Sequence, residues 1–380
     1  MTPWGIALVQ CNLRQMHHLS WVVAVMLGLS MFGDMSATAC GAQDSKHHNG
    51  AKGDNGAQQD KRTHDHDVTA GAAKWYVTMH GENSGNTIRA LDPKGALVPG
   101  SMLGPVTSGV AEPKDLRGML HLGDSSLLVV SAFKNDTRLV RYGPAGDAGV
   151  RPFMAVFTEY SETANPGLVH TYALAVGTDG TIFASDQDTN TVTRFGGIGS
   201  ETPGSPLASP AEIAGLGLPP GVLIPSRQVS PGGLVKVRGL AIAPDGSLLV
   251  ADKGASRVVS YDPQTGALRK VLADRSHGLK GPIQVLVTPD SQRILIGDNE
   301  AHCVFAVSLA DGSVTTLLDS KRCPEEPSAL LIDGHSLLLG DRKTKSIRRF
   351  DLDNPSKAPT ILANGIPDAP EFLLLASPGG

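Results

Sequence analysis

Apolar and polar positions follow one order that is repeated along residues 74–380. Each unit has an apolar strand, a tight turn, a second apolar strand, a polar loop and a third strand. Five such units begin at Leu116, His170, Arg238, Pro282 and Pro327. Their tight turns carry Asp-Gly or Asp-Ser pairs, which tolerate the backbone conformations that join antiparallel strands. The pattern therefore predicts an all-β protein made of repeated antiparallel sheets.

An aspartate recurs at the end of the second strand in four of these units, and a β-branched residue follows it six positions later. The four aspartates are Asp186, Asp252, Asp298 and Asp341. An aspartate in a loop accepts hydrogen bonds from nearby backbone N–H groups. We therefore expect these residues to hold their loops in shape and not to form a cluster of catalytic carboxylates.

The two ends of this repeated region complement each other. Residues 74–95 supply the second and third strands of a unit without a first strand, and residues 370–376 form a first strand with nothing after it. Joined together they make one unit from both ends of the chain, which leaves no open sheet edge. The count predicts a six-bladed β-propeller at 74–380, closed by N- and C-terminal strands that share one blade.

One connection is much longer than the others. The third strand that ends at Phe195 is followed by an insertion at about 196–233, rich in Gly, Pro and Ser, before the next unit begins. Connections of this length are often functional lids or partner loops. A passive surface insertion is the alternative, and both interpretations stay open.

The N-terminal segment predicts export from the cytoplasm. The apolar run at 21–32 is too short to span a bilayer, and Ala37-Thr38-Ala39 offers a cleavage site, so residues 1–39 are interpreted as a signal peptide. Cys40 follows directly and would be free or lipidated. Residues 40–73 are polar and predict a disordered tether. The expected location is secreted, periplasmic or cell-envelope, with membrane contact only through a lipid anchor at Cys40.

The cysteines agree with this location. Cys303 and Cys323 lie within the repeated region, 20 residues apart. In an oxidising compartment they could close one bridge, so we predict a disulfide between them.

Composition narrows the function classes. The formal net charge is −4, which argues against a nucleic-acid partner. Aromatic residues make up 4% of the chain, too few to favour the aromatic platforms of a glycan-binding site. No HExxH, phosphate-loop or GxSxG motif is present.

The unit GLAIAPDGSLLVADKGASRVVSYDP, from Gly239 to Pro263, resembles NHL repeats, which form propellers of about six blades. The resemblance covers roughly residues 74–380 and implies an architecture more than a function. Three enzyme groups are similar in architecture: regucalcin-like lactonases with a divalent metal held by Glu, Asn and Asp, streptogramin B lyases with a His and a metal, and peptide-amidating lyases with several His around zinc. Few of the site residues of these enzymes match this chain. For example, Arg238-Gly239 stands where lactonases have Asn-Gly.

Candidate site residues lie where first strands begin, at the central axis of one face, which we call the top face. They are Arg117, His170, Arg238, Gln284, Glu326 and Glu371. Arginine recognises carboxylate or phosphate groups, so the leading hypothesis is a propeller that binds a small polar or anionic ligand, or a protein partner, on this face. The plainer alternative is that Arg117 and Arg238 only pair with Glu326 and Glu371.

The alternative function is a metal-dependent lyase or lactonase. His170 and Glu371 would be its catalytic residues, and a divalent metal its cofactor. His80, His170, His277 and His302 are all expected on top-face segments. Zinc needs three or four ligands that converge on one point, and these histidines come from different blades.

Overall fold

The computed structural model describes residues 72–146 and 149–377. The predicted signal peptide, Cys40 and nearly all of the predicted tether lie outside the described residues. Within these ranges, no helix is long and apolar enough to cross a membrane.

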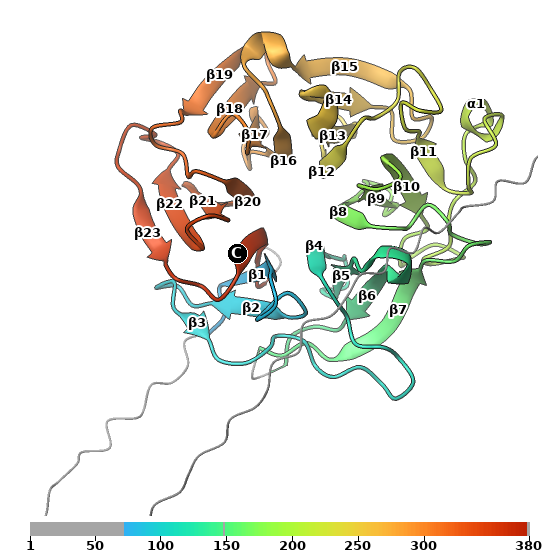
Figure 1. The fold of residues 1–380 in the computed structure, drawn as a ribbon, viewed down its shortest axis with the longest axis horizontal. Helices are drawn as coiled ribbons and strands as arrows, with labels where there is room; N and C mark the ends of the chain where they lie inside the picture. The colour runs from blue at the N-terminus through green and yellow to red at the C-terminus, as the bar shows by residue number, and fades with distance from the viewer. Residues whose placement is uncertain (1–71, 147–148, 378–380) are drawn as a thin grey trace, which may run out of the picture. The chain divides into compact units, whose positions relative to one another are not determined.

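Six four-stranded antiparallel sheets form a ring (Figure 1), which confirms the predicted six-bladed β-propeller. We number the blades 1 to 6 around the ring, starting with the blade that contains both ends of the fold. The innermost strands of blades 1 to 6 are β24 (Ala369–Leu375), β4 (Leu116–His121), β8 (Thr171–Val176), β12 (Val237–Ile242), β16 (Pro282–Val287) and β20 (Pro327–Asp333). The second strands are β1 (Trp75–His80), β5 (Leu127–Ser131), β9 (Ile182–Asp186), β13 (Leu248–Asp252), β17 (Arg293–Asp298) and β21 (Ser336–Asp341).

The remaining strands complete each blade toward the outside. The third strands are β2 (Ile88–Leu91), β6 (Arg138–Tyr142), β10 (Thr191–Phe195), β14 (Arg257–Tyr261), β18 (Cys303–Ser308) and β22 (Ser346–Asp351). The outermost strands are β3 (Leu97–Val98), β7 (Phe153–Glu159), β11 (Val222–Ile224), β15 (Leu268–Ala273), β19 (Val314–Leu318) and β23 (Thr360–Ala363). Short helical segments in the described connections are η1 (Lys134–Asp136), α1 (Ala211–Ala214), η2 (Lys253–Ala255) and η3 (Arg275–His277).

Blade 1 closes the ring as predicted. Strand β24 pairs antiparallel with β1, with Leu375 opposite Trp75 and Ala369 opposite His80. The innermost strand of blade 1 therefore comes from the C-terminal end of the fold and its other three strands from the N-terminal end.

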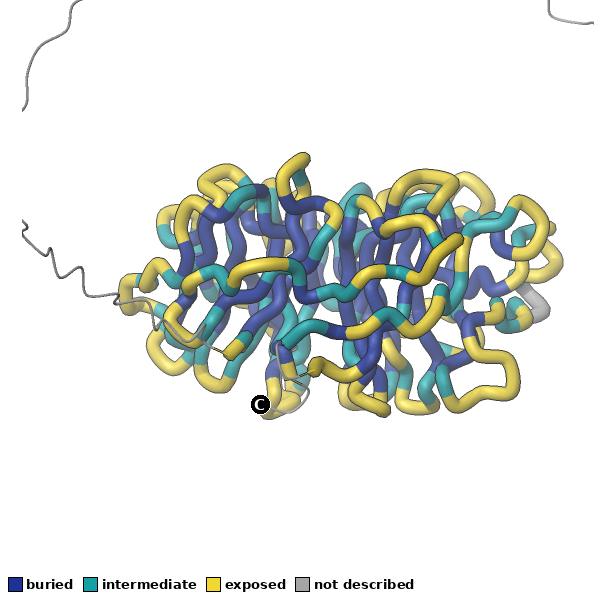
Figure 2. Tube along the Cα trace, turned by 90° about the horizontal axis from the view of Figure 1, so that it is seen from below, coloured by how far each residue is buried: buried dark blue, intermediate teal, exposed yellow. Residues whose placement is uncertain are grey.

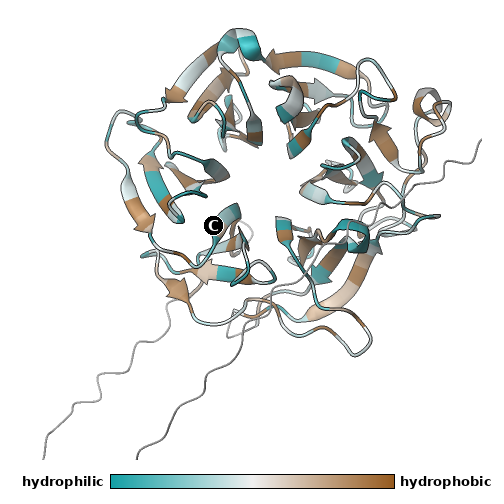
Figure 3. Ribbon diagram, viewed as in Figure 1, coloured by the Kyte–Doolittle hydropathy of each residue, from teal (hydrophilic) through white to brown (hydrophobic). Residues whose placement is uncertain are grey.

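The core lies between neighbouring blades, because each blade covers a face of the next. One cluster joins Phe183 of blade 3 to Val250 of blade 4, and all five residues of β5, β9 and β13 are buried. Burial on both faces explains why β5 and β13 each begin with four consecutive apolar residues. Figure 3 shows hydrophobic colour along many of the blade strands. Figure 2 shows buried residues along the strands and exposed residues mainly in the connections.

The tight turns also follow the sequence. The residue after the turn aspartate has a positive φ in all five units: Ser125, Gly180, Gly246, Ser291 and Gly334. An L-residue with a large side chain would be strained in this conformation, which explains the repeated Asp-Gly and Asp-Ser pairs.

The insertion at about 196–233 completes blade 3. It contains α1 and β11, and β11 pairs with β10 as the outermost strand of that blade. Gly204 packs so closely on the backbone of Phe157 in blade 2 that an added Cβ would lie 1.9 Å from its carbonyl oxygen. Figure 1 shows α1 and β11 at the outer rim of the ring. These two elements therefore do not cover the central axis.

The predicted disulfide is not present in the structure. Cys303 and Cys323 are both free thiols. The Cys303 Sγ donates a hydrogen bond to the carbonyl of Ala301 at 3.3 Å, and burial raises the pKa of both thiols. A bridge depends on the Cα separation and on the directions of the two Cβ atoms, and sequence spacing carries neither.

Candidate functional site

The pairing between innermost and second strand shifts near the top face in every blade. Such a β-bulge redirects the side chains beside it. The residue that follows the last pair before the shift occupies the same place in each blade. From blade 1 to blade 6 these residues are Glu371, Arg117, Tyr172, Arg238, Ile283 and Ser328. Blades 1 to 4 thus bring charged or hydrogen-bonding side chains to one level of the axis.

Glycine after each of the two arginines lets neighbouring innermost strands approach. A Cβ on Gly118 would lie 2.9 Å from the carbonyl oxygen of Tyr172, and one on Gly239 would lie 2.9 Å from the Cα of Gln284. No side chain fits at either position without moving backbone. The Arg-Gly pairs that stood out in the sequence therefore combine a close strand contact with an arginine side chain at the axis.

The backbone of each arginine is fixed by the blade before it. The Thr78 hydroxyl of blade 1 donates to the carbonyl of Arg117 at 3.0 Å. The Ser185 hydroxyl of blade 3 donates to the carbonyl of Arg238 at 2.6 Å. These hydrogen bonds between blades hold both arginines at the axis.

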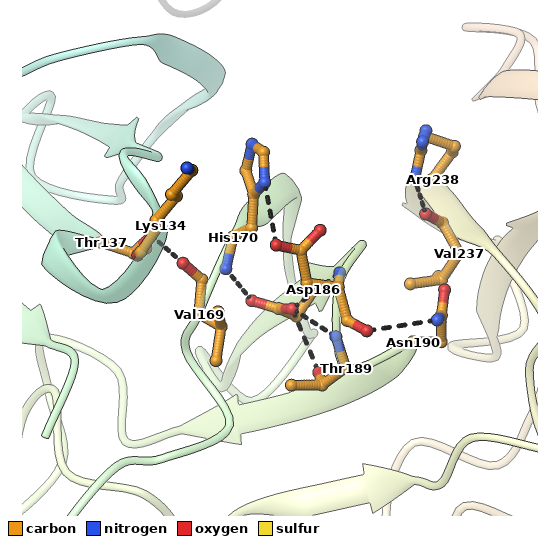
Figure 4. A network of polar contacts seen from close by, with 10 residues as sticks. Lys134, Thr137, Val169, His170, Asp186, Thr189, Asn190, Val237 and Arg238 are labelled. Carbon is orange, nitrogen blue, oxygen red and sulfur yellow. Dashed lines mark hydrogen bonds and ion pairs between the residues drawn. The ribbon is translucent and has the colours of Figure 1, made fainter. Parts of the chain in front are cut away.

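The repeated aspartates hold the loops of the top face, as predicted. Asp186 is buried and accepts hydrogen bonds from the backbone N–H of His170 at 2.5 Å and of Thr189 at 2.9 Å (Figure 4). It thereby ties the loop after the second strand to the residue before the first. The other buried aspartates that accept backbone N–H groups in this way are Asp252, Asp298 and Asp341.

Tyr172 lies at the centre of the axial contacts. The Arg238 guanidinium lies 5.1 Å from the centre of its ring, and the Phe372 ring lies at 5.1 Å with a tilt of 57°. Phe372 belongs to blade 1 and Tyr172 to blade 3, so their contact joins two blades that are not adjacent. Blade 2 lies between them, and its Gly118 has no side chain. Burial and then the Glu371 carboxylate raise the pKa of Tyr172, so its hydroxyl stays protonated and donates to Glu371 at 3.5 Å.

Glu371 has partners other than the ones expected. Its carboxylate pairs with Arg342 at 3.1 Å, and its side chain is 2% exposed. The Glu326 side chain is exposed, and its backbone N–H is what binds Asp341. No described residue forms an ion pair with Arg117 or Arg238. The plainer alternative, in which these two arginines pair with Glu326 and Glu371, is therefore wrong.

Arg117 and Gln284 are buried, and each has one donor nitrogen without a partner. Each is 6% exposed. The Arg117 Nη1 and the Gln284 Nε2 have no hydrogen-bond acceptor among the described residues. Buried donors are almost always satisfied, and an unsatisfied one costs about 1–3 kcal/mol, more when it is charged. These two donors therefore require an acceptor from outside the described chain.

We name these residues the axial cluster: Arg117, Tyr172, Arg238, Gln284, Arg342 and Glu371. Arg117, Arg238, Gln284 and Glu371 were predicted for this face, and the structure brings them to it. Tyr172 and Arg342 were missed. The signal for Tyr172 was present, because it holds the same place in its unit as Arg117 does in the preceding one.

His170 lies at the rim of the cluster. Its Nδ1 lies 3.2 Å from Asp188, and Figure 4 shows its side chain and that of Arg238 pointing to the same side of the molecule. Burial, and then the charge of Arg117, lower the pKa of His80, so this imidazole is neutral at pH 7.

The histidines do not make a metal site. His277 pairs with Asp274 within η3. Among residues 72–146 and 149–377, no group of three or more His, Cys, Asp or Glu side chains is arranged to hold a metal ion. The donor set expected for a metal-dependent lyase or lactonase is therefore not assembled in these ranges.

Comparison with solved structures identifies the architecture. No protein-family model and no curated protein matches the chain. A structure of a nidogen/laminin complex aligns over 80% of this chain and 98% of the other, with a TM-score of 0.58 and 16% identity. A putative 6-phosphogluconolactonase from Bacteroides fragilis (77% and 82% covered, 16% identity) and a virginiamycin B lyase from Staphylococcus aureus (77% and 85%, 12% identity) give TM-scores of 0.49 and 0.47. At such identities the comparison shows the propeller fold and leaves function to the site.

Proposed function

We propose that the protein binds a small anionic ligand at the axial cluster of its top face. The observation that carries the proposal is Arg117, whose side chain is buried and has an Nη1 without an acceptor. An uncompensated buried charge costs several kcal/mol. A carboxylate or phosphate oxygen would satisfy this donor and remove that cost.

The neighbouring groups favour an anion of small size. Gln284 offers a second donor without an acceptor, and Arg238 adds a positive charge beside Tyr172. Arginine forms strong charge-assisted hydrogen bonds with carboxylate and phosphate groups.

The enzymatic alternative has less support. Glu371 is occupied by Arg342 and by the Tyr172 hydroxyl, which leaves it poorly placed to bind a metal or to take a proton. The histidines and carboxylates of the described ranges do not converge on a metal position. A protein partner would have to present an acidic group to the same arginines, and a small ligand is favoured because the unsatisfied donors are buried.

We further propose that the protein acts outside the cytoplasm. The proposal rests on the apolar run at 21–32 and the Ala37-Thr38-Ala39 sequence before Cys40. It concerns residues outside the described ranges and is independent of the binding proposal.

Titration calorimetry of the full chain tests the binding proposal. The probes are acetate, succinate, inorganic phosphate and sulfate, in a buffer of low ionic strength. We expect at least one to bind with one site per chain, and Arg117→Met to weaken it by about 10- to 100-fold, the value of a charge-assisted hydrogen bond. The matched control is Lys270→Met, which removes an exposed cation from β15.

Two results would contradict the proposal. One is the absence of saturable binding of every probe. The other is equal binding by the Arg117→Met and Lys270→Met proteins, which would place the anion elsewhere on the surface.

A further inference from the structure

The axial cluster carries an excess of positive charge. It contains three arginines, Arg117, Arg238 and Arg342, and one carboxylate, Glu371. Two groups beside these side chains are neutral at pH 7, because burial raises the pKa of Tyr172 and lowers the pKa of His80. Two positive charges are therefore left over inside the cluster.

The two remaining positive charges of the axial cluster belong to two different arginines. Arg342 is compensated by Glu371 at 3.1 Å. Arg117 has no ion pair among the described residues, and the only described hydrogen bond of the Arg238 guanidinium joins its Nη1 to the carbonyl of the preceding Val237 at 2.8 Å. The uncompensated charges are thus those of Arg117 and Arg238.

These two arginines are on opposite sides of one blade. Arg117 belongs to blade 2 and Arg238 to blade 4, at the same place in the bulge of their innermost strands. Tyr172 holds that place in blade 3 between them, and Arg238 stacks on its ring. The two guanidinium groups therefore present two points of positive charge and do not act as a single fork.

The surroundings offset these charges only in part. The Glu371 and Asp188 carboxylates favour the charged form of Arg238, whereas Lys236 carries a charge of the same sign close to it. The charge of Asp115 favours the protonated form of His80, and the Asp115 side chain is half-buried.

We infer that the ligand is a small dianion, with one negatively charged oxygen for Arg117 and another for Arg238. This inference rests on the proposed function and narrows it. A dicarboxylate and a phosphate monoester share the required chemistry, which is two negative charges within the span of three adjacent innermost strands. Gln284, with its free amide donor, would bind a further oxygen of the same molecule.

Matched pairs of probes test the second charge. Calorimetry with the full chain compares malonate, succinate and glutarate with their monoamides, which have nearly the same size and one charge fewer. Methyl phosphate, a dianion at neutral pH, and dimethyl phosphate, its monoanionic counterpart, form the second arm. We expect the best dianion to bind at least about tenfold more tightly than its monoanionic partner. The arm that contains the tighter-binding dianion shows whether the ligand is a dicarboxylate or a phosphate ester.

Arg238 supplies the matched variants. Arg238→Gln should remove the preference for the dianion, and Arg238→Lys should keep most of it because the charge remains. Thermal unfolding of both proteins checks that the fold is intact, and the Lys variant keeps the test decisive if the Gln variant is unstable.

The outcomes separate the two proposals. Equal affinity for a dianion and its monoamide would overturn the dianion inference and leave the proposed anion site standing. No binding in either arm would overturn the proposed function itself. A preference for dianions that persists in Arg238→Gln would overturn the assignment of the second charge to Arg238.

Discussion

Two buried arginines of this propeller have opposite surroundings. Arg151 is 2% exposed and Arg117 is 6% exposed. Arg151 donates from Nε, Nη1 and Nη2 to four acceptors at 3.0–3.1 Å: the Tyr76 hydroxyl and the carbonyls of Ser125, Gly143 and Ala376. The Arg117 Nη1 has no hydrogen-bond acceptor among the described residues. Burial alone therefore does not make an arginine a candidate for binding, whereas a buried charge with an unsatisfied donor does.

The two positions explain the difference. Ala376 follows the innermost strand of blade 1, and Ser125 and Gly143 belong to blade 2, so Arg151 joins the blade that closes the ring to its neighbour. Arg117 lies at the opposite end of the innermost strands, in the axial cluster. We interpret Arg151 as a structural residue and Arg117 as a binding residue.

The largest expected effect is at Arg151. Arg151→Met leaves three carbonyl groups and the Tyr76 hydroxyl without their donor, so we expect it to lower the free energy of unfolding by about 3–5 kcal/mol. Urea denaturation measures the change. The control Arg141→Met removes a partly exposed pair with Asp124 and should cost less than about 1 kcal/mol. Similar losses in the two proteins would refute the structural role of Arg151.

Arg117→Met should change the free energy of unfolding in the opposite direction. Methionine has a comparable length and carries no charge to desolvate, so we expect the ligand-free protein to gain about 1–2 kcal/mol of unfolding free energy. The same urea titration, in a buffer without multivalent anions, measures it. A loss of more than about 2 kcal/mol would show that Arg117 has structural partners, and the comparison with Arg151 would then fail.

A smaller effect is expected from Asp262, a surface carboxylate with all its partners. The backbone N–H of Thr265, followed by the Arg269 guanidinium, lowers the pKa of Asp262 to about 2. A lowered pKa in the folded state stabilises the fold above the ordinary value near 4, and that stability is lost as pH falls toward 2. After allowance for solvent screening, Asp262→Asn should cost about 1 kcal/mol at pH 7.

Denaturation at several pH values measures this last difference. The gap between wild type and Asp262→Asn should close between pH 4 and pH 2. A gap of constant size over that range would mean that the charge of Asp262 does not stabilise the fold.

Most of the fold could be predicted because its signals are local and repeated. Apolar runs bounded by turn residues predicted the strands, and the unpaired strands at 74–95 and 370–376 predicted the shared blade. The outermost strand of blade 3 was hidden, because Val222–Ile224 is a short apolar segment inside a stretch rich in Gly and Pro. The composition of a long insertion, averaged over its length, does not reveal a strand as short as this one.

The site could be predicted only in part. The first strands of a propeller surround the axis, so Arg117, Arg238 and Gln284 could be placed there from the repeat alone. The sequence could not show which arginine pairs with Glu371, because this pairing depends on side chains that reach from one blade to another. Arg342 comes from the loop after β21 and reaches the carboxylate of β24.

The shared blade has a practical consequence for the orientation of the molecule. Trp75 and Leu375 are opposite each other at one end of blade 1, while His80 and Glu371 lie at the other end, about 16 Å away for a strand of this length. Both chain ends of the propeller therefore leave it on the side away from the arginines. Attachment to a sensor chip or a bead next to Trp75 or Leu375 would leave the proposed binding face directed outward, ready for the anion measurements above.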